Sequence, residues 1–454
     1  MTDRPRKKKR AQPIDRVVTV VSMSLVVIIG VTLWIGDRTA PVVLAFSWQN
    51  QQITAQDQAF FITFNRPMDR ESVETNLRIQ PNLSGKFSWS GRRMAFTLTS
   101  PAIYGTTYNL NLTNAFDRFH QELGDRLPIQ PFTAQFHTPQ PILAFVNAQG
   151  QLTFLHLSEQ KLETVTPPQL KVTDYRFSPD RATIYFFATG QQEKLLQQKL
   201  YRLDRANQTL TVMADDPKYQ NFKFDLAPNG QVLVLQRLHL QNQGEYGLWV
   251  IREGGQITPL DNRPGGEFQI APDSNSLALA QGEGIAILAI EPNSPPLDFL
   301  PKFGSLLSFA PSGRQALTIA FNKDFTRSLY LVANTGEQKE LLKIKGSIIS
   351  AHFAPQEKKV YCLLSRLVEG QKQYQEEPEL WSIDLRTMTS QKIYQLPDRR
   401  NLTMQIAPDG QYLAISSIAG DASLPQLEIL PLANATPSLT PMLKFIGDRP
   451  RWLP

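Results

Sequence analysis

A short phrase built around a proline recurs through the C-terminal two-thirds of the chain. Its copies read as an apolar residue, then Ser or Ala, then Pro, and most continue with a small polar residue. Consecutive prolines are 49, 44, 39, 44 and 53 residues apart. A recurring unit of this size predicts a repeat architecture. The six copies are Phe177-Ser178-Pro179-Asp180, Leu226-Ala227-Pro228-Asn229, Ile270-Ala271-Pro272-Asp273, Phe309-Ala310-Pro311-Ser312, Phe353-Ala354-Pro355-Gln356 and Ile406-Ala407-Pro408-Asp409.

The residues that follow each phrase indicate β-strands. A run rich in aliphatic and aromatic residues comes first, as at residues 183–187 and 412–415, and a second run follows, as at residues 380–383. No stretch of the repeats holds a sustained helical period. Four short strands in roughly 40–50 residues are typical of one blade of a β-propeller. Because proline cannot donate to a central ladder, its place at the end of a blade's first strand suits this fold.

The two ends of the repeat region predict a closed ring. Residues 142–165 read as a blade without its first strand, and the chain finishes on Pro450-Arg451-Trp452-Leu453-Pro454, which resembles the missing phrase. Pairing this tail with the first blade removes an open sheet edge. We therefore predict a propeller over residues 139–454 that has seven blades, or six if one copy is degenerate.

These repeats resemble the TolB-type, WD-like propeller repeats. The likeness rests on the phrase, on the strand after it and on a second strand with Leu-Trp or Leu-Tyr, as at Leu248-Trp249 and Leu380-Trp381. It covers about 310 residues of the chain. The resemblance implies a fold and says little about function, since propellers carry many functions.

Residues 41–138 predict a separate β-sandwich. Seven short apolar runs with turn signals between them occupy about 100 residues, which is typical of an immunoglobulin-like domain. The segment resembles the bacterial Ig-like domain of S-layer and other surface proteins, and the resemblance implies a spacer or adhesive module. The matching residues include Phe64-Asn65-Arg66-Pro67-Met68-Asp69, Gly105-Thr106-Thr107-Tyr108 and Phe136-His137-Thr138.

The N-terminus predicts a signal anchor. Residues 17–36 hold 20 positions without a charge, and residues 1–16 hold seven Lys or Arg. Such a span matches the hydrocarbon thickness of a bilayer, and basic flanks stay in the cytoplasm. We therefore expect a single transmembrane helix at 17–36 in the bacterial cytoplasmic membrane, with the bulk of the chain outside. A cleaved signal peptide is the alternative.

Charge and motifs exclude several function classes. The first 16 residues carry +5 of the net charge of +6, so the basic balance is a topology signal and no nucleic-acid surface is predicted. The five histidines and the one cysteine show no metal-ligand spacing. No serine-nucleophile elbow or phosphate loop is present, so we predict no metal site, no cofactor and no catalytic residues.

One set of polar residues emerges when the repeats are aligned. The position three residues before each proline is polar in all seven copies, between mostly apolar or small neighbours. Since the first strand of a blade is innermost, these residues should form a ring near the central channel. They would either make hydrogen bonds between blades or line a funnel for a ligand. The ring consists of Arg176, Asp225, Gln269, Ser308, His352, Gln405 and Arg451.

We therefore expect an all-β, membrane-anchored protein whose propeller acts as a non-catalytic scaffold or receptor. Its partner would be an envelope protein or a cell-wall ligand, and the two ring arginines favour a carboxylate. Two alternatives stay open: a propeller hydrolase with its site at the channel mouth, and a structural cell-surface spacer.

Overall fold

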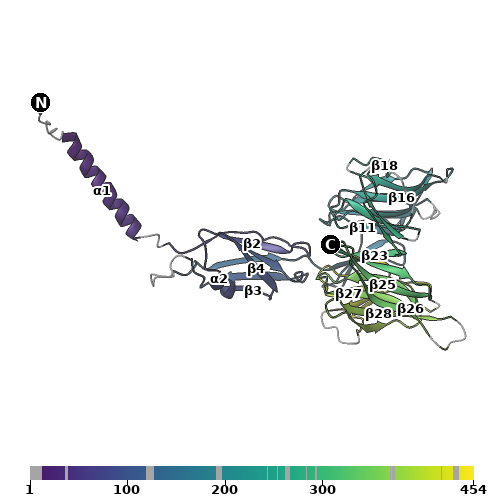
Figure 1. Ribbon diagram of the computed structural model, residues 1–454. Helices are drawn as coiled ribbons and strands as arrows, with labels where there is room; N and C mark the ends of the chain where they lie inside the picture. Colours follow the sequence, from purple (N-terminus) through teal and green to yellow (C-terminus); the bar gives the residue numbers. More distant parts are fainter. Residues whose placement is uncertain are drawn as a thin grey trace, which may run out of the picture.

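The chain folds into one long helix, a small β-sandwich and a large array of β-sheets, which follow one another along the molecule (Figure 1). Helix α1 spans Pro13–Ile35. The predicted all-β class is confirmed for the two domains that follow it. The computed structural model describes residues 13–35, 39–118, 127–190, 197–242, 244–252, 254–260, 266–282, 284–291, 294–368, 370, 374–420, 422–432 and 439–454.

The predicted membrane span at residues 17–36 falls on helix α1, up to residue 35. The basic segment of residues 1–12 lies outside the described residues. Within the described part of the chain, no helix is both long enough and apolar enough to cross a membrane.

The sandwich domain, comprising strands β1 to β7, consists of two sheets with the orders β1-β2-β5-β4 and β3-β6-β7. Alternate residues of its strands face the core, as in β2, where Phe60, Ile62 and Phe64 are buried. One short helix, α2 (Arg70–Asn76), directly precedes β3. The strands are β1 Val43–Phe46, β2 Ala59–Phe64, β3 Leu77–Gln80, β4 Gly85–Ser90, β5 Arg93–Leu98, β6 Thr107–Leu112 and β7 Phe132–His137.

The repeat domain, comprising strands β8 to β34, is built from antiparallel sheets in which neighbours in sequence are neighbours in space. Five sheets have four strands each within the described residues. They contain β8 Ile142–Val146, β9 Leu152–His156, β10 Lys161–Thr164 and β34 Asp448–Trp452; β11 Leu170–Phe177, β12 Thr183–Gly190, β13 Lys199–Asp204 and β14 Thr209–Ala214; β15 Tyr219–Leu226, β16 Leu233–His239, β17 Tyr246–Ile251 and β18 Ile257–Pro259; β19 Phe268–Ile270, β20 Ser276–Gln281, β21 Gly284–Ala289 and β22 Asp298–Pro301; and β30 Arg399–Ile406, β31 Tyr412–Ala419, β32 Gln426–Pro431 and β33 Leu443–Ile446.

A sixth sheet has seven strands because β26 runs on without a break. The first half of β26 pairs with β25, and its second half, from Gly346, pairs with β27. Gly346 has a φ of +135°, and a side chain there would meet the backbone of β27, so the close approach of β26 to β27 at this residue requires glycine. The strands are β23 Ser305–Phe309, β24 Gln315–Phe321, β25 Thr326–Ala333, β26 Gln338–Phe353, β27 Lys359–Leu367, β28 Glu376–Asp384 and β29 Thr389–Gln395.

The recurring phrase forms the turn between the first and second strands of a sheet, except for the fifth copy, which joins β26 to β27 within the seven-stranded sheet. In the second copy, the N–H of Ala227 donates to Val232 O (2.8 Å) and the N–H of Gly230 donates to Ala227 O (2.8 Å). Gly230 has a φ of +75°, a conformation that glycine adopts without steric cost. The copies at Ala310 and Ala407 repeat both hydrogen bonds. The phrase therefore recurs in the sequence because the same hydrogen-bonded turn recurs in the structure.

The C-terminal tail closes the first sheet. Strand β34 pairs with β8, with Arg451 opposite Ala144 and Trp452 opposite Leu143, which is the pairing predicted from the tail's likeness to the phrase. Leu453 follows with 1% exposure and packs in a cluster with residues of the next sheet, among them Tyr175. The last residues thus join the first two sheets of the repeat domain.

The sandwich domain contacts the repeat domain at the side where the phrase turns lie. The N–H of Tyr104 donates to the buried Oδ2 of Asp409 (3.0 Å), which belongs to the sixth phrase. The guanidinium of Arg181 lies over the Tyr104 ring, 5.3 Å from its centroid. A cavity of about 880 Å³ lies between the two domains. The sandwich domain lines it with residues 55–58 and 98–101. The repeat domain contributes the prolines of five phrases: Pro228, Pro272, Pro311, Pro355 and Pro408.

Candidate binding site

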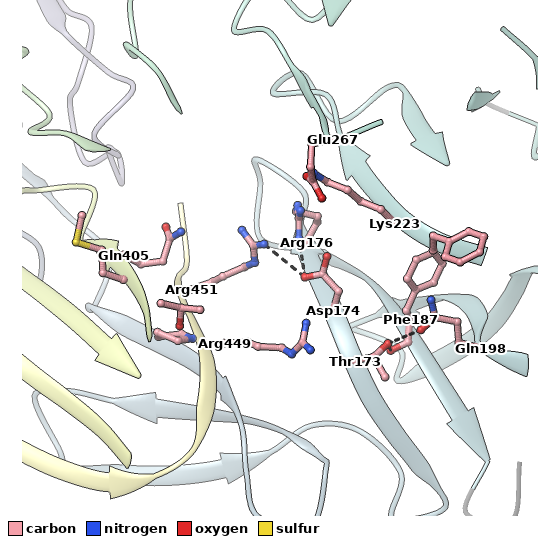
Figure 2. Close-up of a pocket in the computed structure, with 14 residues that line it drawn as sticks. Thr173, Asp174, Arg176, Phe187, Gln198, Lys223, Glu267, Gln405, Arg449 and Arg451 are labelled. Carbon is pink, nitrogen blue, oxygen red and sulfur yellow. Dashed lines mark hydrogen bonds and ion pairs between the residues drawn. The ribbon is translucent and has the colours of Figure 1, made fainter. Parts of the chain in front are cut away.

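The first strands of several sheets surround a polar cavity of about 540 Å³, which we name the arginine cavity (Figure 2). Its walls come from β11, β12, β15, β30 and β34, and from the residues just before β13 and β19. A smaller cavity of about 260 Å³ adjoins it and shares four of its residues: Arg176, Lys223, Glu267 and Arg451.

The direction of the first strands places the arginine cavity opposite the sandwich domain. In β11, Thr173, Asp174 and Arg176 line the cavity, and the strand then leads to the phrase at Pro179. The phrase ends of the other sheets line the interdomain cavity instead. Among the described residues, none from the sandwich domain lines the arginine cavity. One mouth of the array is therefore covered by the sandwich domain, and the arginine cavity lies toward the other.

Arg176 links three neighbouring sheets through two carboxylates. Its Nη1 donates to Asp174 Oδ1 on the same strand (2.8 Å), and its Nε donates to Asp225 Oδ1 on β15 (2.8 Å). The other oxygen of Asp225 accepts the N–H of Ile270 on β19 (3.0 Å). These charge-assisted bonds hold the guanidinium of Arg176 in a fixed orientation at the cavity wall.

The closing strand β34 adds two more arginines to the same wall. Arg451 Nη2 donates to Asp174 Oδ1 over a longer distance of 3.4 Å. The buried hydroxyl of Tyr175 lies within hydrogen-bond distance of two carbonyl oxygens, Arg449 O (2.5 Å) and Ala144 O (2.8 Å), and shares its one proton between them. Figure 2 shows the side chains of the two arginines and of Arg176 directed toward the region around Asp174. The bond between Asp174 and Arg451 thus brings together residues 277 positions apart in the chain.

The charges of the cavity shift the pKa values of its groups in opposite directions. Burial alone would raise the pKa of Asp174, but the neighbouring Arg176 and Arg451 outweigh it, so the pKa lies below its ordinary value. Burial would likewise lower the pKa of Arg176, and Asp174 with Asp225 raises it instead. For Arg451, burial and the positive Arg176 lower the pKa. The carboxylates of the cavity therefore offset the cost of burying the positive charge for Arg176 but not for Arg451.

Lys223 and Glu267 form the second charged pair of the cavity. Lys223 Nζ donates to Glu267 Oε2, and the two residues lie on the wall formed by β15 and the segment before β19. Taken together, four cationic side chains and two carboxylates line the arginine cavity. Within the described residues, no cluster of three or more His, Cys, Asp or Glu side chains could hold a metal ion.

Five of the seven predicted ring residues line the two adjoining cavities. Arg176 and Arg451 line both of them, whereas Gln405 lines the arginine cavity alone. Asp225 and Gln269 line the smaller one.

Ser308 and His352 are not among the lining residues of these two cavities. The hydroxyl of Ser308 donates to Ala351 O on the neighbouring innermost strand (2.8 Å), which is a bond between repeats. Burial and the charge of Arg451 lower the pKa of His352 to about 4. The ring therefore contains a member that bonds between repeats and members that line a cavity.

The prediction missed a second set of cavity residues, two positions before the first. Asp174, Lys223, Glu267, Thr403 and Arg449 all line the arginine cavity, and each stands five residues before a phrase proline. Because side chains repeat every two residues along a strand, this position shares a face with the predicted ring. Alignment of the repeats five residues before the proline would have found it, although the side chains there are chemically mixed.

Comparisons with known proteins agree with this architecture. Residues 37–138 match the model of the bacterial Ig-like domain family, so the sandwich domain belongs to that family. No curated protein matches the chain.

Many solved structures match the fold. TolB from Acinetobacter baumannii is 12% identical, with a TM-score of 0.42 and coverage of 89% of this chain and 87% of that one. The C-terminal WD40 domain of Sif2 is 14% identical, with a TM-score of 0.45 and coverage of 68% and 84%. An oligogalacturonate lyase from Vibrio parahaemolyticus is 11% identical, with a TM-score of 0.48 and coverage of 64% and 92%. Such distant likenesses carry no argument about activity, and what the findings establish is an Ig-like domain joined to a propeller-like array.

Proposed function

We propose that the protein is a non-catalytic scaffold or receptor that binds a carboxylate-bearing ligand in the arginine cavity. The observation that carries the proposal is the weak pairing of Arg451 in a cavity lined by four basic side chains. Among the described residues, Arg451 has one ion pair, a long one to Asp174 (3.4 Å), and the same oxygen of Asp174 already accepts a shorter bond from Arg176 (2.8 Å). A ligand carboxylate would complete the pairing of these guanidinium groups, which present forks of donors suited to it.

The fold supports binding by a rigid surface. If the two halves of β26 count as strands of two blades, the array is a seven-bladed propeller closed by β34. Because each first strand is held between neighbouring sheets, the cavity walls are preorganised, and little ordering is required when a ligand binds. The proposal assigns no proton-transfer role to Asp174, because Arg176 and Arg451 keep it ionised.

The partner class and the location are parts of the same proposal. The partner is an envelope protein or a cell-wall ligand, met on the outer side of the bacterial cytoplasmic membrane. The location rests on the sequence alone, on the uncharged residues 17–36 and the basic residues before them, since no described helix is long and apolar enough to cross a membrane. Protease added to spheroplasts should degrade both domains and spare residues 1–16, whereas protected domains would overturn the location.

A capture experiment tests the function. The full chain, crosslinked in its envelope and purified in detergent, should carry a partner that the double variant Arg449→Gln, Arg451→Gln loses. Arg386→Gln is the matched control, because Arg386 is an exposed arginine in the turn after β28. Equal capture by wild type and double variant would refute the cavity as the binding site. A wild type that captures nothing would favour the structural spacer.

A further inference from the structure

A second charged group lies outside the arginine cavity, in the sheet of strands β15 to β18. Arg237 on β16 is only 7% exposed. Its guanidinium carbon lies 4.0 Å from the ring centroid of Tyr219 and 4.7 Å from that of Trp249. The two aromatic side chains come from the neighbouring strands β15 and β17, so the cation is held between the flanking strands.

The guanidinium has no acceptor among the described residues. Its Nε is buried without a hydrogen-bond partner in that part of the chain. Contact with aromatic faces compensates a cation only in part, and buried charges in proteins are ordinarily paired. The buried side chain of Arg237 therefore retains an unmet requirement for an anion.

The register of the strands leaves space in front of this group. Opposite Arg237 on β17 stands Gly247, which has no side chain. Both residues line a cavity of about 710 Å³, with Tyr219, Trp249 and Pro259 also in its wall. This cavity shares no lining residue with the arginine cavity. A ligand could thus reach Arg237 without passing through the centre of the propeller-like array.

The other charged groups around the cavity are already engaged or lie further out. Glu245, at the rim, accepts hydrogen bonds from the Tyr219 hydroxyl (3.1 Å) and from Asn242 Nδ2 (2.9 Å). Burial lowers the pKa of Arg237, and the nearby Tyr219 and Asp216 offset only part of that effect. The guanidinium is therefore the group of this cavity that gains most from a new partner.

We propose that this cavity is a second binding site, in which Arg237 pairs with a ligand carboxylate while Tyr219 and Trp249 hold its guanidinium in place. The forked donors of arginine match the two oxygens of a carboxylate. The carboxylate could come from an acidic sugar or from an acidic peptide side chain, which share this chemistry. The site is independent of the proposed function of the arginine cavity.

Calorimetric titration of the full chain in detergent, at constant ionic strength, tests the proposal. The probes are sodium glucuronate, sodium N-acetylglutamate and uncharged glucose. At least one carboxylate should bind saturably, and the tighter of the two indicates the source, whereas glucose should not bind. In the background of the double variant Arg449→Gln, Arg451→Gln, which removes carboxylate binding by the arginine cavity, Arg237→Gln should weaken this binding at least tenfold, and the exposed control Arg386→Gln should leave it unchanged. Absence of saturable carboxylate binding in that background, or equal binding with and without Arg237→Gln, would overturn the proposal.

A second measurement does not depend on the folding of a variant. Crystals of the wild-type protein soaked with the carboxylate that binds should show it within hydrogen-bond distance of Arg237 Nε. Asn221 on β15 is the register partner of Arg237 on β16, and its buried Oδ1 also lacks a partner among the described residues. A soaked crystal in which Arg237 Nε bonds only to Asn221 Oδ1 or to water would contradict the proposal.

Discussion

Replacement of Leu453 by alanine should destabilise the repeat domain, because this side chain packs where the C-terminal tail joins the first two sheets. Leu453 is 1% exposed and packs in the cluster that joins the first two sheets. Truncation of a fully buried leucine typically costs about 2–5 kcal/mol. The backbone bond from Leu453 N–H to Ile142 O (3.0 Å) does not involve the side chain, so the loss would report packing alone.

The matched control is Leu162→Ala. Leu162 lies on β10 of the same sheet but is 50% exposed, so its truncation should change stability by no more than about 0.5 kcal/mol. Urea unfolding followed by circular dichroism would compare both variants with wild type. Equal midpoints for Leu453→Ala and Leu162→Ala would refute the reasoning, because they would mean that packing of the Leu453 side chain adds nothing to closure.

Two further predictions concern the ring. Acidification from about pH 7 to about pH 4 should destabilise the wild type more than His352→Gln. The pKa of His352 in the folded state, about 4, lies below its value in the unfolded state, so the unfolded state takes up the proton first as the pH falls. Melting curves of both proteins at the two pH values would check this, and an equal loss of melting temperature in both would contradict it. Ser308→Ala should cost about 0.5–1.5 kcal/mol, since its bond to Ala351 O joins two repeats, and an unchanged melting temperature would show that this bond is dispensable.

The fold was largely predictable because each repeat carries the same turn. The hydrogen bonds of Ala227 and Gly230 recur in later copies, so the phrase reports a backbone geometry that any copy must satisfy. The long strand β26 was not predictable in the same way. Its two halves belong to different repeats and meet at Gly346 without a turn, and a missing turn leaves no signal in the sequence.

The candidate site was predictable only in part. The residues three before each proline share a polar character, and alignment finds them. Asp174 and Arg449 stand two positions earlier, where the aligned side chains include a threonine and charges of both signs, so no common chemistry marks them. The site near Arg237 gave no signal at all, because its burial depends on Tyr219 and Trp249 from two other strands.

Site-specific photo-crosslinking tests the central claim, that the arginine cavity binds the partner, most directly. Gln405 lines that cavity, whereas Gln391 is an exposed residue on the outer strand β29. Gln405→p-benzoylphenylalanine in the full-length chain should yield a crosslinked partner in the envelope, and Gln391→p-benzoylphenylalanine should not. Crosslinks from position 391 with none from position 405 would contradict the account.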